Sequence, residues 1–249
     1  MRDLVLAVDI GNSSCKLAIF EGDVIAQTWR LPTAALNRQI QGLLEPIQQR
    51  VSATVVGSVV SSATSVCESA LQELGIAPFV VTSATRLPIR NEYATPHTVG
   101  VDRLANAVGA YVTPGAPAIV VDVGTAVTID VLTETNGFAG GAIWAGPDLI
   151  AAALTNNTAA LPQVEIQGSV NAIAKTTEEG IRAGIVFGLA GGIERLVKEV
   201  CQQLGYTPLV VATGGGARHL KGVCSVVDQF NPDLTLVGLK RIFDHNSVT

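Results

Sequence analysis

Two segments of the sequence place a carboxylate at the end of an apolar run and follow it with glycine and hydroxyl residues. In the first, Asp9 follows the apolar run at residues 4–8 and precedes a glycine, an asparagine and two serines at positions 11–14. Glycine lets the backbone approach a phosphate, N–H groups and hydroxyls can surround its oxygens, and a carboxylate can hold hydrated Mg²⁺. A plain hairpin whose Asp and Asn cap local backbone groups is the alternative, because short glycine motifs are weakly specific.

The second segment, with Asp122, Gly124 and Thr125, repeats this pattern after the apolar run at residues 118–121. Two such loops could bind one nucleotide from two sides, as is common where ligands bind at a domain interface. A third glycine turn, at residues 213–216, could pack against a flat adenine or ribose, or form an ordinary connection that opens a helix. The two carboxylate loops together therefore predict a nucleotide site more strongly than either loop alone.

A further segment, at residues 100–103, places an acidic and a basic residue next to each other at the start of a predicted helix. Asp102 could be an N-cap and Arg103 a surface charge, which would suffice for most helices. Alternatively, an ionised Asp102 could aim at a substrate hydroxyl while the guanidinium of Arg103 holds an anionic group. Phosphoryl transfer depends mostly on positioning and charge stabilisation, so one carboxylate near the acceptor oxygen is a sufficient base. The residues alone leave both interpretations open.

Other common catalytic motifs are missing from the sequence. It has no G-x-x-x-x-G-K-[ST], no G-x-G-x-x-G in the first strand-to-helix turn and no G-x-S-x-G. The three histidines show no H-x-x-x-H spacing and the four cysteines form no C-x-x-C pair. We therefore expect neither a histidine metal site, nor structural zinc, nor a disulfide framework, and interpret the cysteines as small buried side chains.

The composition narrows the class of protein further. The 249 residues carry Lys+Arg 16 and Asp+Glu 21, a net charge of −5, which argues against nucleic-acid binding through clustered basic residues. With 48% apolar residues the chain can bury a core, so disorder is excluded. The longest charge-free stretch, residues 104–121, contains Pro114 and Pro117 and predicts helix, turn and buried strand rather than a membrane span. The apolar run at residues 4–8 is too short for a signal peptide, so we expect a cytoplasmic protein.

The elements that would position these residues begin in the same way in each half of the chain. Residues 4–8 predict a buried strand and residues 16–20 and 24–29 the strands after it, while residues 118–121, 127–132 and 138–143 repeat the arrangement. Further strands are predicted at 53–56, 79–81 and 209–212, and helices at 33–45, 63–74, 102–112, 178–203 and 236–243. The turn-rich residues 114–117 predict a boundary between domains 1–115 and 116–249. The pattern favours an α/β protein built from two copies of one unit.

Four features, taken in order, resemble the type III pantothenate kinases. They are the loop that begins at Asp9, the spacing Tyr93-x-x-Pro96-x-x-x-Gly100-x-Asp102-Arg103, the loop Asp122-x-Gly124-Thr125, and Gly140-Gly141-x-Ile143. The resemblance covers essentially the whole chain, because residues 232–239 also look like that family's C-terminal signature. It places the chain in the superfamily of acetate kinase, sugar kinases, heat-shock ATPases and actin. It thus implies two duplicated ribonuclease-H-like domains, with mixed sheets flanked by helices and ATP between them.

The resemblance also implies a reaction and a role for each matching residue. The reaction is transfer of the γ-phosphate of ATP to the primary hydroxyl of pantothenate, the first step of coenzyme A biosynthesis. The phosphate loop would comprise Asp9, Ile10, Gly11, Asn12, Ser13, Ser14, Cys15 and Lys16, with Asp9 near Mg²⁺ through water. Thr125 would contact ATP, and Asp122 would ligate an activating K⁺ or NH₄⁺. Pantothenate would contact Tyr93, Gly100, Val101, Asp102, Arg103 and Thr177.

Within that substrate site, Asp102 would be the proton acceptor and Arg103 would face the pantothenate carboxylate. Thr177 would complete the site across a homodimer interface. The chain departs from the family pattern at three places: the Trp-Ala-Gly-Pro run at 144–147 where Pro-Gly is usual, Ser13 where threonine is commoner, and Thr176 in place of asparagine.

Two other functions fit the same scaffold: a non-enzymatic accessory factor for transcription, and another small-molecule kinase of the superfamily. Retention of every acidic motif residue favours an enzyme over the accessory factor. Another kinase would need a different explanation for Tyr93 and for the element at residues 100–103.

Overall fold

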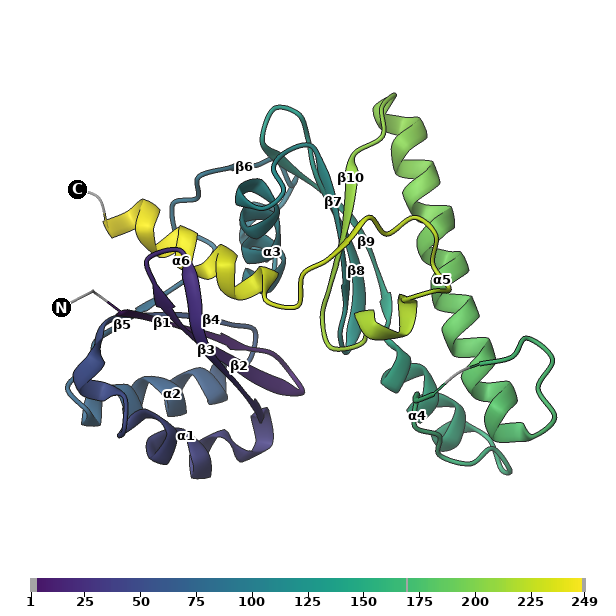
Figure 1. Cartoon of the computed structure of the whole chain (residues 1–249), viewed down its shortest axis with the longest axis horizontal. Coiled ribbons are helices and arrows are strands. Elements are labelled where there is room, and N and C mark those ends of the chain that lie inside the picture. Colours follow the sequence, from purple (N-terminus) through teal and green to yellow (C-terminus); the bar gives the residue numbers. More distant parts are fainter. Residues whose placement is uncertain (1–3, 169, 248–249) are drawn as a thin grey trace. The chain divides into compact units, whose positions relative to one another are not determined.

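The computed structural model describes residues 4–168 and 170–247, which divide into two compact units (Figure 1). The first unit contains residues 4–115, 136–138 and 233–247, and the second contains the described residues of 116–135 and 139–232. The chain leaves the first unit between Gly115 and Ala116, where the sequence places the domain boundary. The units differ from the predicted domains at the C-terminal end, because residues 233–247 pack within the first unit.

A five-stranded sheet with the strand order β3-β2-β1-β4-β5 forms the centre of the first unit. The strands are β1 (Leu4–Ile10), β2 (Ser14–Glu21), β3 (Val24–Pro32), β4 (Val51–Ser58) and β5 (Pro78–Val80). β1 pairs antiparallel with β2 and β2 with β3, whereas β4 runs parallel to β1 and β5 parallel to β4. All but one of the β1 residues are buried, which explains the continuous apolar run.

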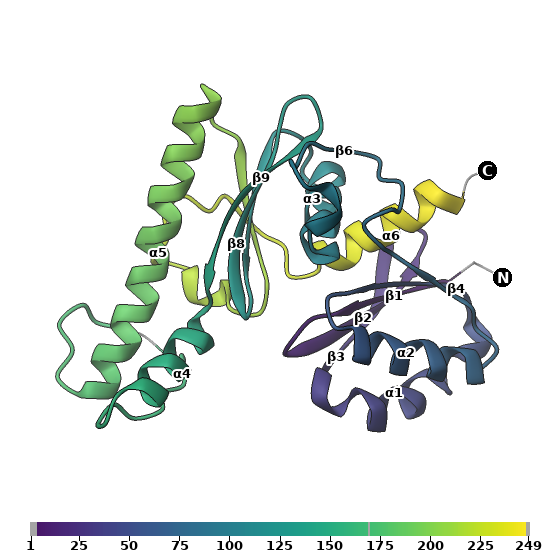
Figure 2. The same cartoon turned by 180° about the vertical axis from the view of Figure 1, so that it is seen from behind.

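Four helices flank this sheet. α1 (Leu36–Leu44) and α2 (Ser61–Glu73) lie side by side (Figure 2). Their buried side chains form one hydrophobic core with side chains of β1, β2 and β4. The side chains that they contribute to this core are Leu36, Ile40, Leu44, Ala63, Cys67, Ala70 and Leu71. α3 (Val101–Val112) and α6 (Leu234–Ser247) pack against each other and against β4. A β-carbon at Gly57 of β4 would press on Leu239 and Val101, so a glycine there lets both helices approach the sheet.

α6 belongs to the first unit because it crosses α3 at two glycines. A β-carbon on Gly109 would overlap the carbonyl oxygen of Leu234, and one on Gly238 would overlap that of Ala105. The apolar side chains that α6 buries are Leu234, Leu236, Leu239 and Ile242. Burial of each such side chain stabilises the fold by about 1.5–3 kcal/mol, which favours packing of the C-terminal helix on the first unit.

The second unit repeats the same sheet order. Its strands are β7 (Ala118–Val123), β8 (Ala126–Leu132), β9 (Gly137–Ala145, whose first two residues count with the first unit), β10 (Leu209–Thr213) and β11 (Gln229–Phe230). They lie in the order β9-β8-β7-β10-β11, with β7 antiparallel to β8 and parallel to β10, and the short strand β6 (Arg90–Asn91) adds a sixth strand by pairing with the first two residues of β9. The duplicated order confirms the predicted fold class of two mixed sheets flanked by helices.

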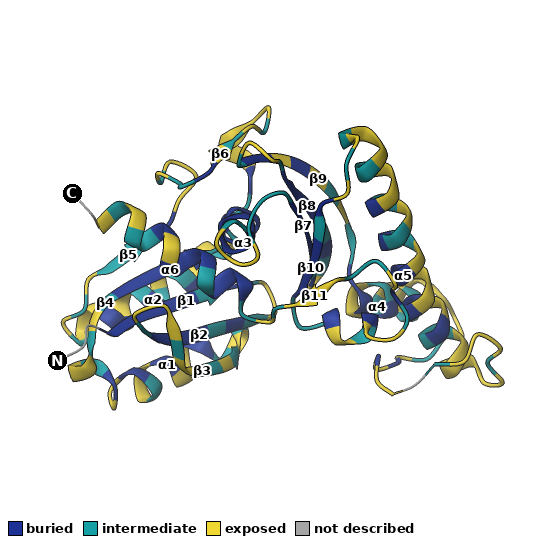
Figure 3. Cartoon of the chain, turned by 45° about the horizontal axis from the view of Figure 1, so that its top comes forward, coloured by how far each residue is buried: buried dark blue, intermediate teal, exposed yellow. Residues whose placement is uncertain are grey.

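Two helices, α4 (Pro147–Asn157) and α5 (Thr177–Leu204), belong to the second unit, and α5 runs along its sheet (Figure 1). Buried residues of α5, among them Ile185, Leu189 and Ile193, form one core with Ile119 and Ile129 of the strands. Figure 3 shows buried residues concentrated in the strands of both units. The burial of both β7 and β10 explains their apolar sequences.

Two local features differ from the sequence-based expectations. The run at residues 144–147 ends β9 and begins α4, a helix that was not predicted: Gly146 is its N-cap and Pro147 occupies the first turn, a position that tolerates the missing N–H. The glycine turn at residues 213–216 opens a short 3₁₀ helix, Ala217–Leu220, rather than an α-helix.

Three further observations concern the described part of the chain as a whole. All four cysteines are free, and Cys15, Cys67 and Cys224 are buried, as expected for small hydrophobic side chains. Among the described residues, no helix is both long and apolar enough to cross a bilayer. Residues 4–168 and 170–247 also contain no group of three or more His, Cys, Asp or Glu side chains that could hold a metal ion.

Candidate active site

The first carboxylate loop connects β1 to β2. Asp9 is partly exposed and lies directly opposite Lys16 in the antiparallel ladder, so the two side chains project from the same face of the sheet. The Gly11 N–H donates a hydrogen bond to the Ser14 carbonyl oxygen at 3.1 Å, which closes the turn. Asn12 and Ser13, between them, are exposed. The loop thus presents polar groups beside a carboxylate and an ammonium group.

Thr33, the residue directly after β3, holds this loop in place. Its N–H donates to the Ser13 carbonyl oxygen at 3.1 Å and its hydroxyl to the Gly11 carbonyl oxygen at 2.7 Å. The sequence analysis missed Thr33, because no local motif marks a residue that acts on a turn 22 positions earlier. Ile10 and Cys15 are fully buried in the core, so these two members of the predicted loop can contribute only backbone groups. Burial also raises the pKa of the Cys15 thiol and keeps it protonated.

The second carboxylate loop connects β7 to β8, and two other glycine segments, at Gly146 and at residues 213–216, pack against it. The Gly124 N–H donates to the Ala126 carbonyl oxygen at 2.9 Å, and the Gly146 N–H donates to that of Thr125 at 2.9 Å. A β-carbon on Gly146 would overlap the Gly124 carbonyl oxygen, so a larger residue could not approach this closely. The start of α4 therefore packs against the Thr125 loop through Gly146, which belongs to the run at residues 144–147.

The turn at residues 213–216 completes this cluster. Gly214 has a φ of 86°, and a β-carbon there would overlap the Oδ1 atom of Asp122. The Gly216 N–H donates to the Val123 carbonyl oxygen at 2.8 Å. Thr213 lies opposite Asp122 in the parallel ladder, and its fully buried hydroxyl has no hydrogen-bond partner among the described residues. The third glycine turn therefore belongs to the same site as Asp122.

The element at residues 100–103 forms the N-terminus of α3. Gly100, not Asp102, is the N-cap residue, and the Arg103 N–H donates to Asp102 Oδ1 at 2.8 Å. A β-carbon on Gly100 would overlap Oδ1, so the glycine makes room for the Asp102 carboxylate to fold back over the helix end. Burial raises the pKa of Asp102, and the Arg103 N–H and positive charge oppose that rise.

Arg103 is buried, with 7% of its surface exposed, so it is not the surface charge of the simpler interpretation. Its Cζ atom lies 5.7 Å from the centre of the Tyr93 ring and 5.4 Å from that of Phe138. The structure thus brings Tyr93 together with residues 100–103, as the spacing motif requires. The sequence analysis missed Phe138, because its place near Arg103 depends on strand pairing.

Thr177 lies in the second unit, exposed as the first residue of α5. The preceding Thr176 caps this helix: its Oγ1 accepts a hydrogen bond from the Glu179 N–H at 3.2 Å, and Glu179 Oε2 accepts one from the Lys175 N–H at 3.0 Å. Threonine followed three residues later by glutamate is a helix-start signal in sequence. Thr176, which stands where the family usually has asparagine, is therefore the N-cap of α5.

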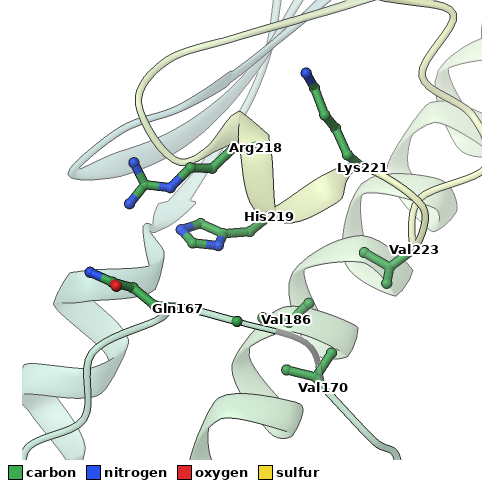
Figure 4. A pocket seen from close by; sticks show the side chains of 8 residues that line it. Gln167, Val170, Val186, Arg218, His219, Lys221 and Val223 are labelled. Atoms are coloured by element: carbon green, nitrogen blue, oxygen red, sulfur yellow. The ribbon is translucent and has the colours of Figure 1, made fainter.

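A cavity of about 640 Å³ lies in the second unit beside the glycine turn (Figure 4). Its lining residues are Gln167, Gly168, Val170, Val186, Arg218, His219, Lys221 and Val223. The side chains of Gln167, Arg218 and His219 lie near one another, whereas Lys221 extends away from them. Burial and the nearby Arg218 charge lower the pKa of His219, against the opposing effect of Asp148. The cavity lining therefore combines basic residues, neutral hydrogen-bonding groups and an apolar wall.

An apolar groove of about 500 Å³ lies along α4 and α5. It is lined by Trp144, Ile150, Leu154, Leu161, Gly180, Ile181, Gly184, Ile185, Gly188 and Leu189. Gly184 and Gly188 are exposed, and a β-carbon on either would meet no atom within 4 Å. The groove thus exposes an apolar surface with room for the side chains of another molecule.

Two units of one sheet order, each with a carboxylate and glycine loop after its first strand, have the actin-like ATPase fold. Solved structures of this fold are similar to the chain. A Campylobacter jejuni protein described as a conserved putative Baf family transcriptional activator is 19% identical with a TM-score of 0.64, over 98% of this chain and 100% of that one. Component A of (R)-2-hydroxyglutaryl-CoA dehydratase from Acidaminococcus fermentans is 16% identical with a TM-score of 0.58, over 98% and 99%. At these identities the likeness concerns the fold alone.

Sequence comparison gives the family. A model of the type III pantothenate kinases matches residues 5–199. A type III pantothenate kinase from Acidothermus cellulolyticus is 35% identical over 260 residues, which cover 98% of this chain and 99% of the relative. One from Finegoldia magna is 34% identical over 259 residues, or 99% of each chain. The chain belongs to the type III pantothenate kinase family, and the resemblance of its motifs is confirmed.

Proposed function

We propose that this kinase transfers the γ-phosphate of ATP to the primary hydroxyl of pantothenate, which yields 4′-phosphopantothenate. The observation that carries the proposal, beyond family membership, is the group at the start of α3. There a buried Arg103 and a carboxylate with a raised pKa lie next to each other, beside the Tyr93 ring. Perturbed titratable groups of this kind are typical of sites that bind and activate a substrate.

Asp102 is the proposed proton acceptor. The acceptor hydroxyl of the substrate would donate a hydrogen bond to a carboxylate oxygen of Asp102, which orients the oxygen for attack and takes its proton as the new bond forms. A pKa above that of an ordinary aspartate makes the ionised carboxylate a stronger base. Most of the remaining acceleration in phosphoryl transfer comes from positioning and charge stabilisation.

Arg103 is the proposed partner of the pantothenate carboxylate. A guanidinium pairs with a carboxylate through two parallel N–H donors, which fixes both position and orientation. Tyr93, Gly100, Val101 and Thr177 would line the rest of this substrate, as the family's motif implies. A homodimer that brings Thr177 to the substrate of the partner copy is part of the proposal. The apolar groove with its exposed Gly184 and Gly188 is our candidate for that dimer contact.

The loop from Asp9 to Lys16 is the proposed phosphate site. The exposed Asn12 and Ser13 can offer backbone N–H groups and a hydroxyl, while Ile10 and Cys15 can offer only backbone. Thr125 would contact ATP as well. We assign the adenosine part of ATP to the cavity beside residues 213–216, because its volume, its polar side chains and its apolar wall suit a flat heterocycle with a polar edge.

Two cations are part of the family's chemistry, and the residues present fit them. Oxygen ligands of the kind that K⁺ or NH₄⁺ would need lie where β7 and β10 end: Asp122 Oδ1, the Val123 carbonyl oxygen and the buried Thr213 hydroxyl, which has no hydrogen-bond partner within the described part of the chain. A single carboxylate, Asp9, suits Mg²⁺ held mostly by water and phosphate. When bound, Mg²⁺ would neutralise negative charge on the transferred phosphate.

A coupled assay of ADP formation tests the proposed reaction. The purified protein, with ATP, Mg²⁺ and K⁺, is expected to form ADP only when pantothenate is added, and mass spectrometry should identify one added phosphate on pantothenate. Omitting pantothenate measures background ATP hydrolysis. If neither K⁺ nor NH₄⁺ supports pantothenate-dependent turnover, the proposal is wrong.

A further inference from the structure

Phe138 forms a compact group with the two residues that the proposed function places at the substrate carboxylate. The Arg103 Cζ atom lies 5.4 Å from the Phe138 ring centre and 5.7 Å from the Tyr93 ring centre. The two ring centres lie 6.0 Å apart, with the ring planes tilted by 37°. Arg103 and the two rings thus occupy the corners of a nearly equilateral triangle, and Phe138 is its fully buried corner.

A short parallel ladder sets the positions of both rings. β6 (Arg90–Asn91) pairs with the first two residues of β9, with Asn91 opposite Phe138. The Arg90 N–H donates to the Asn136 carbonyl oxygen at 2.9 Å, and the Glu92 N–H donates to that of Phe138 at 3.0 Å. Tyr93 follows Glu92 directly. The backbone of two segments about 45 residues apart in the chain therefore fixes both rings next to Arg103.

This arrangement suits the chemistry of a guanidinium. A buried cation loses hydration, and the negative faces of aromatic rings compensate part of that loss. Arginine suits such contacts better than lysine, because its guanidinium is planar and weakly hydrated. The attraction is to the ring quadrupole, so it does not compete with a carboxylate for the N–H donors. Aromatic contacts can therefore restrain Arg103 in a geometry that still allows a two-pronged pair with an anion.

We propose that Phe138 is a positioning residue for pantothenate, because its ring holds the Arg103 guanidinium where the substrate carboxylate pairs with it. The proposal rests on the function proposed above, which assigns that carboxylate to Arg103. Phe138 is fully buried and has no polar side-chain atom, so it acts only through its neighbours. Tyr93, in contrast, is partly exposed and is itself a predicted substrate contact.

Three substitutions of Phe138 test this role. Phe138→Leu keeps an apolar side chain and removes the ring, and mono- and trifluorinated phenylalanines at position 138 keep the shape while weakening the negative ring face. We expect Phe138→Leu to raise the KM for pantothenate about tenfold, and fluorination to raise it progressively, with kcat and the KM for ATP within about twofold of wild type. A purely structural ring would be insensitive to fluorination.

Phe243→Leu is the matched control. The Phe243 ring pairs with that of Phe79 in the same unit, with centres 5.9 Å apart, so this variant removes a ring from an aromatic pair that has no assigned role. We expect the KM for pantothenate to stay at the wild-type value in this variant, even if the melting temperature falls.

A neutral amide analogue of pantothenate separates the possible outcomes. Phe138→Leu should weaken binding of pantothenate but not of the neutral analogue, as measured by calorimetry. Equal weakening of both ligands, or wild-type affinity in Phe138→Leu and both fluorinated variants, overturns the positioning role while the proposed function stands. Failure of the wild-type protein to bind pantothenate overturns the proposed function, and the role of Phe138 with it.

Discussion

Gly214 lies against Asp122 so closely that a β-carbon at position 214 would overlap the Oδ1 atom of the aspartate. Gly214 also has a φ of 86°, a conformation that favours glycine. Asp122 lies in β7 and Gly214 directly follows β10, and these two strands pair in parallel with Thr213 opposite Asp122, so the turn after β10 packs against the end of β7. The close contact joins this glycine turn to the carboxylate proposed to hold a monovalent cation.

Gly214→Ala is therefore expected to damage both stability and activity. The strained backbone and the overlap together should cost about 2 kcal/mol, a loss of about 4–8 °C in melting temperature, and displacement of Asp122 should reduce activation by K⁺. Gly222→Ala is the matched control, because Gly222 has a similar φ of 79° but open space at the β-carbon. If the Gly214→Ala enzyme shows normal activation by K⁺, the turn at residues 213–216 does not position the cation site.

Asp102→Asn should abolish most turnover without loss of stability. Loss of a general base lowers kcat by about 10²–10⁴-fold. Burial raises the folded-state pKa of Asp102, so the ionised carboxylate destabilises the fold at neutral pH, and removing its charge relieves that cost. We expect the melting temperature to stay the same or rise by about 1–3 °C. Asp23→Asn, in the exposed turn between β2 and β3, should change neither quantity.

The pH dependence of the rate should report the same carboxylate. Because the acceptor must be ionised, kcat/KM for pantothenate should fall as the pH drops through the pKa of Asp102, at a pH above that of an ordinary aspartate. The positive charge of Arg103 lowers this pKa, so Arg103→Gln should move the acid limb of the residual activity to higher pH. An acid limb that is the same in both enzymes would argue against Asp102 as the titrating group.

Arg218→Ala tests the adenosine site. Loss of the Arg218 guanidinium, which lies near Gln167 and His219 in the cavity, should raise the KM for ATP about three- to tenfold and leave the KM for pantothenate unchanged, as measured by steady-state kinetics with each substrate varied in turn. Lys198→Ala, an exposed lysine on α5 away from the cavity lining, is the control for removing a positive charge from the same unit. A rise in both KM values would contradict the assignment of the adenosine site to this cavity.

Gly184→Leu and Gly188→Leu test the dimer contact. Either substitution fills the apolar groove, so we expect the mass measured by light scattering to change from dimer to monomer, and turnover to fall because Thr177 no longer reaches a partner. Gly42→Leu, in α1, is a matched control, since it also replaces an exposed helix glycine with open space around it. Replacement of an exposed helix glycine by leucine favours helix formation by about 1 kcal/mol in each of these variants, so unfolding is not an expected cause of dimer loss.

The amino-acid sequence by itself determined the features that depend on local spacing. Runs of apolar residues marked β1, β4, β7 and β10, the periodic leucines and isoleucines marked α1, and Asp9 and Asp122 marked the loops that follow each first strand. These signals are local because a backbone element and its turn are specified by residues only a few positions apart. They were sufficient for the fold class, the duplication and the family.

Only the tertiary structure decided which distant residues meet. Nothing near Phe138 in the sequence indicates that it lies beside Arg103, because the β6–β9 ladder brings them together. Likewise, the spacing of α6 predicts an apolar helix face but not its place on α3, which the glycines at 109 and 238 allow. Contacts between elements depend on strand pairing and close packing across the whole chain, and a local pattern specifies neither.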